Sequence, residues 1–409
     1  MNILYNIIIF LYRWAIMLGS FFNGKIDRLR TGQKEAISIL RKSISKESRY
    51  IWVHAASLGE FEQGRPLIER LKAERPDCKI LLTFFSPSGY EVRKNYEKAD
   101  VICYLPMDTP RNAYRFVKHA NLEMAIFIKY EFWANYLFFT SRKKVPIYII
   151  SAIFRPKQLF FKWYGSWYRG LLKYFDQLFV QDESSAALLR SIGITNVTVA
   201  GDTRFDRVID IASQSRYLPL TESFTNGHLT MVAGSSWVKD EDIFIRHFNE
   251  TPGLKLIIAP HVISKEHIFE ICSKLKRRFV RLSEANAENV QDADCLIVDS
   301  IGFLSSMYRY GQIAYIGGGF GAGIHNTLEA AVFGMPVLFG TNYERFREAV
   351  ELVKLNAAFP IADYEEYCAQ MKILMHDKDF LQKTGEIAYE YVQRNSGATE
   401  KIFAVIKNS

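Results

Sequence analysis

Cysteine is scarce in this sequence, and its five cysteines are widely separated along 409 residues. They show neither Cys-x-x-Cys spacing nor a histidine at metal-ligand spacing, so we expect reduced thiols in a cytosolic compartment. The eight histidines are scattered, and no His-Glu-x-x-His or paired acidic motif occurs. The sequence therefore predicts no metal site and a metal-independent chemistry.

Extended disorder is not indicated either, because hydrophobic residues make up 49% of the chain and charged residues 23%, as in a folded globular protein. Since 409 residues exceed what one compact core usually holds, we expect two domains of roughly 150 to 200 residues each. The formal net charge of +8 favours an anionic membrane, a phosphorylated substrate or a nucleic acid as partner. No nucleic-acid-binding motif accompanies this charge, so we expect no nucleic-acid partner.

The N-terminus carries a nearly continuous apolar and aromatic run at residues 2–22. The run is long enough to cross a bilayer core of about 30 Å, although Arg13 lies in its middle. No small-residue cleavage site follows, and the basic segment at residues 25–30 favours a cytoplasmic location for the rest of the chain. We expect an uncleaved inner-membrane anchor over residues 1–24. An amphipathic helix in the membrane interface and a buried helix of a soluble protein are the alternatives.

Short apolar runs alternate with helical patterns through most of the chain, which is typical of doubly wound parallel sheets. A first series of expected strands lies at residues 50–54, 80–84, 101–104, 124–128, 145–150 and 177–180. A second series lies at residues 229–233, 254–259, 295–298, 313–316 and 336–339. The predicted fold class is α/β, with Rossmann-like domains at residues 25–206 and 229–409, a linker at 207–228 and a cleft between the domains. We expect the site in the loops after these strands, because ligands of such sheets bind at the carboxyl ends of the strands.

A glycine-rich turn follows the expected strand at residues 313–316. Gly318 and Gly319 let backbone amides approach a phosphate, and a helix expected at residues 326–333 offers its N-terminus to an anion. Glu329 lies one turn into that helix, where its carboxylate can accept hydrogen bonds from both ribose hydroxyls. The alternative is a surface glutamate that interacts only with the helix dipole. The glycines do not match Gly-x-Gly-x-x-Gly with a downstream acid, so no nicotinamide or flavin cofactor is expected.

A second motif lies in residues 50–64, which match a strand, a loop and the start of a helix. Glu60 is suited there to act as a general base, which removes the proton of an attacking hydroxyl. Ser57 and Glu60 also have the spacing of a capping box, in which Glu60 only binds the start of its own helix. The residues alone leave these two interpretations equally open.

Both motifs resemble those of the 3-deoxy-D-manno-octulosonic acid (Kdo) transferases. Residues 317–319, 325–329 and 334–337 are similar to the family's donor motif, which reads Gly-Gly-Ser, then Gly-Gly-His-Asn-x-Leu-Glu, then Gly-x-Pro-Val. Residues 54–60 resemble the family's His-Ala-x-Ser-x-Gly-Glu motif. The resemblance covers most of the chain and implies an inverting GT-B glycosyltransferase without a cofactor. Its implied partners are CMP-Kdo, a lipid A precursor (lipid IVA) of lipopolysaccharide biosynthesis, and the inner membrane.

The resemblance also implies roles for individual residues. Glu60 is implied as the base, Glu131 as a group that places the acceptor or the sugar ring, and Arg204 as a cation for the sugar carboxylate or the departing phosphate. As alternatives, Glu131 caps the helix that follows it, and Arg204 forms an interdomain salt bridge. The implied donor-binding residues are Ser235, Pro260, His261, Ile301, Gly302, Phe303, Gly318, Gly319, Asn326, Thr327, Leu328 and Glu329.

Two of the implied donor loops depart from the family pattern. His261 stands where the family has arginine, and histidine is a weaker and pH-dependent cation. Phe303 stands where the family has glutamate. Ser235 lies in another turn, and a serine in a turn is more often a helix cap than a ligand. The alternatives are therefore a UDP-sugar transferase, a UDP-N-acetylglucosamine 2-epimerase, or a non-catalytic nucleotide-sugar-binding protein at the membrane. The expected anchor and the motif at residues 54–60 argue against the epimerase.

Overall fold

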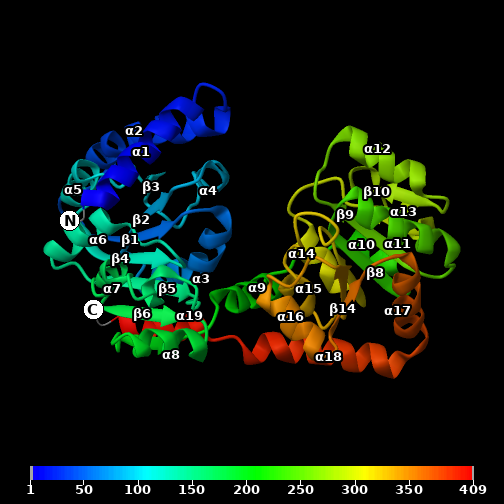
Figure 1. Ribbon diagram of the computed structural model, residues 1–409. Coiled ribbons are helices and arrows are strands. Elements are labelled where there is room, and N and C mark those ends of the chain that lie inside the picture. Colours follow the sequence, from blue (N-terminus) through cyan, green and yellow to red (C-terminus); the bar gives the residue numbers. More distant parts are fainter. Residues whose placement is uncertain (1–2, 408–409) are drawn as a thin grey trace. The chain divides into compact units, whose positions relative to one another are not determined.

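The computed structural model describes residues 3–407, which form two compact units with one seven-stranded sheet each (Figure 1). The first unit contains the residues up to Arg207 and those from Ser396 onward, and the second is Val208–Asn395. Two Rossmann-like α/β domains are predicted from the sequence, and the structure confirms them. Residues 1–2 of the expected anchor and 408–409 of the expected second domain lie outside the described residues.

The sheet of the first unit has the strand order β3-β2-β1-β4-β5-β6-β7, and every neighbouring pair is parallel. Most of its residues are apolar and buried, as expected for a parallel sheet covered on both faces. The strands are β1 (Tyr50–Ala55), β2 (Lys79–Phe84), β3 (Val101–Tyr104), β4 (Leu122–Ile128), β5 (Ile147–Ala152), β6 (Gln177–Val180) and β7 (Val197–Val199).

Alternate residues of β1 pack into two different apolar cores. Trp52 belongs to one core, whereas Ile51 and Val53 belong to the other, because successive side chains of a strand point to opposite faces. The helices that supply the rest of these cores are α1 (Ile3–Gly19), α2 (Gly24–Ser43), α3 (Leu58–Glu74), α4 (Pro87–Arg93), α5 (Pro110–His119), α6 (Ala134–Arg142), α7 (Ser166–Leu172), α8 (Glu183–Ser191) and α19 (Ala398–Ile406). A single 3₁₀ turn, η1 (Leu159–Phe161), precedes α7.

The sheet of the second unit is also parallel, with the order β10-β11-β9-β8-β12-β13-β14. Its strands are β8 (Thr230–Ser236), β9 (Lys255–Pro260), β10 (Phe279–Arg281), β11 (Cys295–Ile297), β12 (Ile313–Ile316), β13 (Val337–Gly340) and β14 (Ala358–Ile361). Its helices are α10 (Pro219–Thr225), α11 (Val238–Glu250), α12 (Lys265–Lys274), α13 (Asn289–Asp292), α14 (Leu304–Met307), α15 (Leu328–Ala331), α16 (Arg347–Lys354), α17 (Tyr364–His376) and α18 (Lys378–Arg394), with 3₁₀ turns η2 (Leu282–Glu284) and η3 (Tyr308–Tyr310).

The boundary between the units differs from the expected one. The expected linker at 207–228 is largely helical, because it contains most of α9 (Thr203–Ser213) and all of α10. The C-terminal helix α19 belongs to the first unit, where Ile402 and Ile406 are fully buried in the core. Asp206 holds its start, since the carboxylate accepts hydrogen bonds from Gly397 N at 2.5 Å and from Thr399 N at 2.7 Å. Apolar burial and this cap explain why the chain returns to the first unit.

The N-terminal helix α1 ends at Gly19 and has 17 residues. At about 1.5 Å per residue it is shorter than a bilayer core of about 30 Å. Within residues 3–407, no helix is both long and apolar enough to cross a membrane. The structure thus does not contain the spanning anchor expected at residues 1–24, and the interfacial alternative stays a prediction.

Candidate functional site

The expected site residues cluster at the point in each sheet where the strand order reverses. In the first unit the order reverses between β1 and β4, and Glu60 follows β1 while Glu131 follows β4. In the second unit it reverses between β8 and β12, and the glycine-rich turn follows β12. Loops at such a switch point diverge to opposite faces of the sheet, which leaves a crevice where ligands of this fold class bind.

Glu60 lies in the first turn of α3, where its carboxylate is half-buried. One carboxylate oxygen, Oε2, accepts a hydrogen bond from Ala56 N at 2.6 Å, and Ser57 Oγ accepts one from Glu60 N at 3.5 Å. Only half of the expected capping box forms, because the Glu60 carboxylate bonds to Ala56 N, one residue before the N-cap Ser57. The other oxygen has no hydrogen-bond partner among the described residues, so Glu60 can both hold the chain before its helix and accept a proton.

The pKa of Glu60 is raised above its ordinary value. Burial is the largest cause, and the negative charge of Glu131 is the second. The hydrogen bond from Ala56 and the nearby His54 and Lys129 offset part of the rise. A carboxylate with a raised pKa is a stronger base, which suits the role expected for Glu60.

Glu131 is held by two side chains from neighbouring strands and loops. Its Oε2 lies 3.2 Å from His54 Nε2 and accepts a hydrogen bond from Trp133 Nε1 at 2.5 Å. The helix that follows, α6, has Trp133 as its N-cap and no side-chain cap. The alternative that Glu131 caps this helix is therefore wrong, and the carboxylate points instead towards the motif at residues 54–60.

His54 is fully buried between the two carboxylate-bearing loops and β2. Its Nδ1 lies 2.9 Å from Thr83 Oγ1, which itself accepts a hydrogen bond from Trp52 Nε1 at 2.8 Å. His54 Nδ1 also lies 3.2 Å from the backbone oxygen of Thr83, so one ring nitrogen faces β2 while the other, Nε2, faces Glu131. The imidazole thus links Thr83 to the carboxylate of Glu131. His54 stands in the quoted motif, but sequence reasoning assigned it no role, because only the fold shows that Thr83 and Glu131 lie on either side of it.

Arg204 lies at the start of α9 and pairs with a carboxylate two residues away. Its Nε and one terminal nitrogen lie 2.9 and 2.8 Å from Asp202 Oδ2, and Gln63 Nε2 donates to Asp202 Oδ1 at 3.1 Å. Burial raises the pKa of Asp202, but the charge and hydrogen bonds of Arg204 and Gln63 outweigh it and lower the pKa overall. This ion pair is local and lies within the first unit. The charges of Glu60 and Asp202 both act on Tyr130, whose pKa is raised mainly by burial, so these loops lie close together.

The glycine-rich turn of the second unit is shaped by close packing of the backbone. Gly318 has φ +95°, and its N–H donates to Asp240 Oδ2 at 2.9 Å. A Cβ on Gly319 would lie 2.5 Å from the Cα of Gly340 on β13. Gly318 is therefore required for the turn, but its amide is occupied and does not offer the phosphate contact that the sequence predicts for it.

The expected helix at residues 326–333 is also shorter than predicted, since α15 has only four residues. Asn326 Oδ1 accepts from Leu328 N at 3.2 Å, and Asn326 Nδ2 donates to Glu329 Oε1 at 3.0 Å. Glu329 is half-buried, whereas Thr327 and Leu328 are fully buried. Since both side chains are buried, a donor contact of Thr327 or Leu328 involves the backbone of this helix start, and their part in donor binding stays a prediction. Asn326 and Glu329 keep a position suited to a ligand.

Three aromatic rings stack at the carboxyl ends of β8, β9 and β12. The rings of Trp237 and His261 are 4.7 Å apart between centroids, and those of His261 and His325 are 4.4 Å apart. Trp237 Nε1 lies 3.3 Å from His325 Nε2. Burial lowers the pKa of His325, and the neighbouring His261 lowers it further. Of these three residues, only His261 is expected as a ligand from the sequence, because nothing in the linear order places Trp237 and His325 beside it.

The remaining expected donor residues lie around this stack in the same unit. Ser235 has φ +53° at the end of β8, and Trp237, not a serine, is the N-cap of the following α11. Pro260 ends β9 and is buried. Ile301, Gly302 and Phe303 form the loop before α14, in which Ile301 is 90% exposed and Gly302 has φ +90°. Among residues 3–407, no group of three or more His, Cys, Asp or Glu side chains is placed to hold a metal ion.

Comparison with known proteins identifies the class. Residues 29–207 match a family model described as 3-deoxy-D-manno-octulosonic-acid transferase (kdotransferase). A 3-deoxy-D-manno-octulosonic acid transferase of Aquifex aeolicus is 29% identical over 372 residues, which cover 87% of this chain and 97% of the relative. One from Haemophilus influenzae is 25% identical over 373 residues, with 87% and 86% covered.

Solved structures show the same fold. The UDP-GlcNAc 2-epimerase of Neisseria meningitidis bound to UDP-GlcNAc is similar with a TM-score of 0.60 at 15% identity, over 88% of this chain and all of that one (100%). A putative UDP-N-acetylglucosamine 2-epimerase of Listeria monocytogenes gives a TM-score of 0.57 at 15% identity, over 88% and 96%. At these identities the likeness concerns the fold alone, two GT-B-like Rossmann domains.

The fold is that of GT-B-type enzymes. The family model over residues 29–207, the relatives named as Kdo transferases and the motifs agree on one class, because each is similar to glycosyltransferases of the Kdo transferase type.

Proposed function

We propose that this enzyme transfers Kdo from CMP-Kdo to a lipid A precursor, lipid IVA, in lipopolysaccharide biosynthesis. The observation that carries the proposal is the state of Glu60, whose second oxygen is unbonded among the described residues and whose pKa is raised. It stands in the motif that resembles that of the Kdo transferases, and two relatives of this chain are named as Kdo transferases.

The acceptor reacts in the first unit. Glu60 takes the proton of an acceptor hydroxyl, and the oxygen forms a bond to the anomeric carbon of Kdo while the bond from that carbon to the CMP phosphate oxygen breaks. CMP leaves with the bonding electron pair, and the configuration inverts. Glu131, fixed by His54 and Trp133, orients the acceptor or the sugar ring. CMP is a good leaving group, so the step needs no second carboxylate as an acid.

The donor binds in the second unit. Glu329 accepts hydrogen bonds from the ribose hydroxyls. Asn326 Nδ2 holds the carboxylate in place by donating to Glu329 Oε1 at 3.0 Å. The stacked rings of Trp237, His261 and His325 offer a face for the cytosine base and imidazole N–H groups for the phosphate. This stack takes the place of the arginine that the family pattern has at position 261. Arg204, in the first unit, supplies a cation for the departing phosphate.

The acceptor is a lipid, and α1 is suited to meet it at the inner membrane. Arg13 lies among a set of large apolar side chains of α1 that are exposed, whereas Ile9 and Ile16 are buried against the rest of the unit. Such a helix lies in the interface, with its apolar side chains in the lipid and the guanidinium among the headgroups. The exposed side chains are Ile3, Leu4, Ile7, Ile8, Phe10, Leu11, Tyr12, Trp14 and Leu18.

The test is Kdo transfer by purified protein, with CMP-Kdo regenerated in the reaction and tetra-acylated lipid A precursor as acceptor. Mass spectrometry detects the added sugar. We expect product with CMP-Kdo, none with UDP-sugars, and no loss of product in EDTA. If well-folded protein gave no product with CMP-Kdo but turned over a UDP-sugar, the assignment to Kdo would be withdrawn and only the GT-B class would remain.

A further inference from the structure

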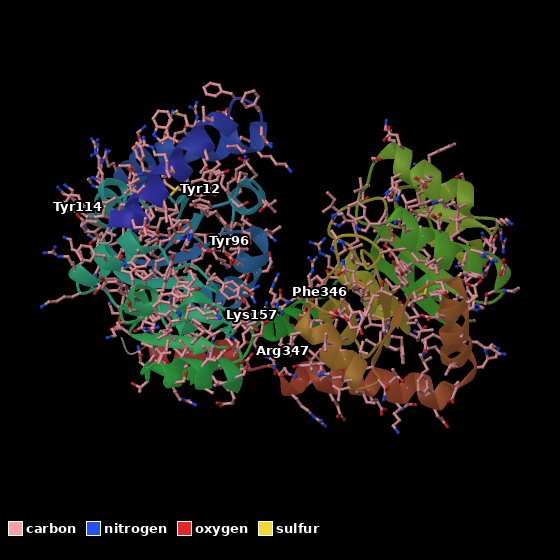
Figure 2. All side chains as sticks on the ribbon, in the orientation of Figure 1. Tyr12, Tyr96, Tyr114, Lys157, Phe346 and Arg347 are labelled. Carbon is pink, nitrogen blue, oxygen red and sulfur yellow. The ribbon has the colours of Figure 1, made fainter. Side chains whose placement is uncertain are left out.

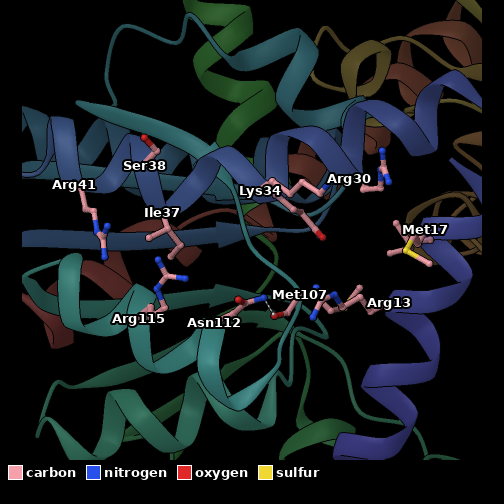
Figure 3. A pocket seen from close by; sticks show the side chains of 12 residues that line it. Arg13, Met17, Arg30, Lys34, Ile37, Ser38, Arg41, Met107, Asn112 and Arg115 are labelled. Atoms are coloured by element: carbon pink, nitrogen blue, oxygen red, sulfur yellow. Dashed lines mark hydrogen bonds between the residues drawn. The ribbon is translucent and has the colours of Figure 1, made fainter.

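A cavity of about 550 Å³ lies between α1, α2 and α5 of the first unit (Figure 3). This volume falls within the range of about 300 to 1,000 Å³ that is usual for small-molecule sites. Its lining contains five cationic side chains and no carboxylate: Arg13 from α1, Arg30, Lys34 and Arg41 from α2, and Arg115 from α5. The cavity therefore concentrates positive charge.

Most of this charge is not neutralised within the protein. Among residues 3–407, no carboxylate forms an ion pair with Arg13, Lys34 or Arg115. Arg30 lies 3.7 Å from Asp27, but its Nε is buried and has no hydrogen-bond partner. Burial without a partner is costly for a charged donor, so this lining favours a ligand that supplies several acceptor oxygens.

Arg41 and Gln33, which also line the cavity, keep donors that the protein uses weakly or not at all. Arg41 Nε donates only to His119 Nε2, at 3.3 Å, and Gln33 Nε2 is buried without a partner among the described residues. The amide of Asn112 is different, since its Nδ2 donates to Met107 O at 3.0 Å. A phosphate matches such a set, because its oxygens accept several charge-assisted hydrogen bonds and carry the opposite charge.

The floor of the cavity is apolar and is shared with the loop that holds Glu131. Ile16 and Met107 line the cavity and are buried in a cluster against which Trp133 packs. Tyr12 on α1 (Figure 2) stacks on Phe85 with ring centroids 6.3 Å apart, and Phe85 lies 4.9 Å from Trp133. A ligand held in the cavity thus lies one layer of rings away from the candidate acceptor site.

We propose that this basic pocket binds a phosphate group of the lipid acceptor, with the acyl chains along the exposed apolar side chains of α1. The inference rests on the proposed function, since the lipid A precursor named there is a phosphorylated glycolipid. Charge complementarity favours a phosphate, and the ring layer that leads to Glu131 favours the phosphate of the acceptor over that of a bulk phospholipid. The pocket fixes the register of the acceptor, so that one hydroxyl lies at Glu60.

The test compares Lys34→Gln and Arg115→Gln with Lys118→Gln. Lys118 is exposed on α5, close in sequence to Arg115, but does not line the pocket, so it controls for loss of surface charge. We expect each pocket variant to raise KM for the phosphorylated acceptor about tenfold, the size typical of one charge-assisted hydrogen bond. The KM for CMP-Kdo stays unchanged. With enzymatically dephosphorylated acceptor, wild type and variants become equal.

A binding experiment separates this inference from the proposed function. Protein is floated with neutral phosphatidylcholine vesicles that contain either the phosphorylated tetra-acylated precursor or the same fraction of phosphatidylglycerol. We expect the pocket variants, and not Lys118→Gln, to lose binding to the precursor vesicles only, even if no sugar were transferred. An equal loss on phosphatidylglycerol would assign the pocket to bulk lipid and overturn the inference. Unchanged binding and unchanged KM would overturn it as well.

Discussion

The loop after β1 and the loop after β12 carry equally recognisable motifs, but the structure uses them differently. In the first loop the motif's glutamate holds the backbone before its helix with one oxygen and leaves the other unbonded among the described residues. In the second loop the amide of Gly318 is bonded to Asp240, so the motif's glycine serves the packing of the turn. A sequence motif therefore predicts where a site lies, but it does not predict as well which atoms of the motif contact the ligand.

The same contrast applies to charge. The first unit gathers Glu60, Glu131 and the Asp202–Arg204 pair around its switch point. At the corresponding point of the second unit, the loops carry three stacked rings and Glu329, and the carboxylate of Asp240 is bonded to the glycine-rich turn. Proton transfer needs a fixed base, whereas nucleotide binding needs a flat face and donors. The four predictions that follow test whether the two units divide the work in this way.

The largest effect is expected for Glu60→Gln. A general base contributes about 10² to 10⁴ in rate, so kcat falls by that factor while the protein stays folded. Ser57→Ala is the matched control, because it removes the hydroxyl cap of the same helix and costs about 1 kcal/mol of stability without removing the base. Steady-state kinetics and thermal unfolding check both. If Ser57→Ala lost as much turnover as Glu60→Gln, the motif would act through the helix and not through the carboxylate.

A smaller effect is expected for Glu329→Gln. Loss of a charged hydrogen-bond acceptor for the ribose costs about 1.5 to 3 kcal/mol, so the Kd for CMP rises roughly 10- to 100-fold. Binding of the lipid acceptor remains at the wild-type level. Isothermal titration calorimetry measures the former and vesicle flotation the latter. Unchanged CMP affinity would favour the alternative, in which Glu329 interacts only with the helix dipole.

The ring stack predicts a pH dependence of CMP binding. The pKa of His325 is lowered by burial and by His261, so the imidazole is neutral at pH 7 and gains a proton when the phosphate binds. Affinity for CMP therefore rises severalfold as the pH falls from about 8 to 6. Calorimetry in buffers of different ionisation enthalpy should show proton uptake, which His325→Gln reduces. Equal heats in all buffers would exclude this part of the account.

The smallest effect concerns the return of α19 to the first unit. Asp206→Ala removes the cap at Gly397 and Thr399 and should cost about 0.5 to 2 kcal/mol. Hydrogen exchange of the amides of α19 should quicken. Asp363→Ala removes the N-cap of α17 in the second unit and serves as the comparison. The expectation fails if both variants change the exchange of α19 equally.

Much of the fold followed from the sequence because long apolar runs specify buried parallel strands. The strands that the sequence analysis did not predict are β7, β10 and β14, which have three or four residues each and a weak apolar pattern. The place of α19 depends on burial of Ile402 and Ile406 in a core some 200 residues away in the chain, which no local pattern shows. The candidate site, too, was predictable only in part.

Glu60, Glu131 and Glu329 lie in the loops where the motifs place them. The ring stack was not predictable, because Trp237, His261 and His325 come from three loops that only the sheet brings together. The basic pocket was missed for a similar reason. Its cations lie on α1, α2 and α5, and in the sequence they look like the ordinary basic residues of solvated helices.

The central claim is that a single carboxylate of raised pKa accepts the proton of the lipid acceptor. Its most direct test is the pH dependence of kcat/KM for Kdo transfer by the wild type and by Glu60→Gln. A base must be unprotonated, so the rate falls as the pH drops through its pKa. We predict a wild-type midpoint above the ordinary glutamate value of about 4.3, because burial and Glu131 raise the pKa of Glu60, and no such midpoint in the variant. A folded Glu60→Gln protein with the wild-type rate and the same midpoint would contradict the account.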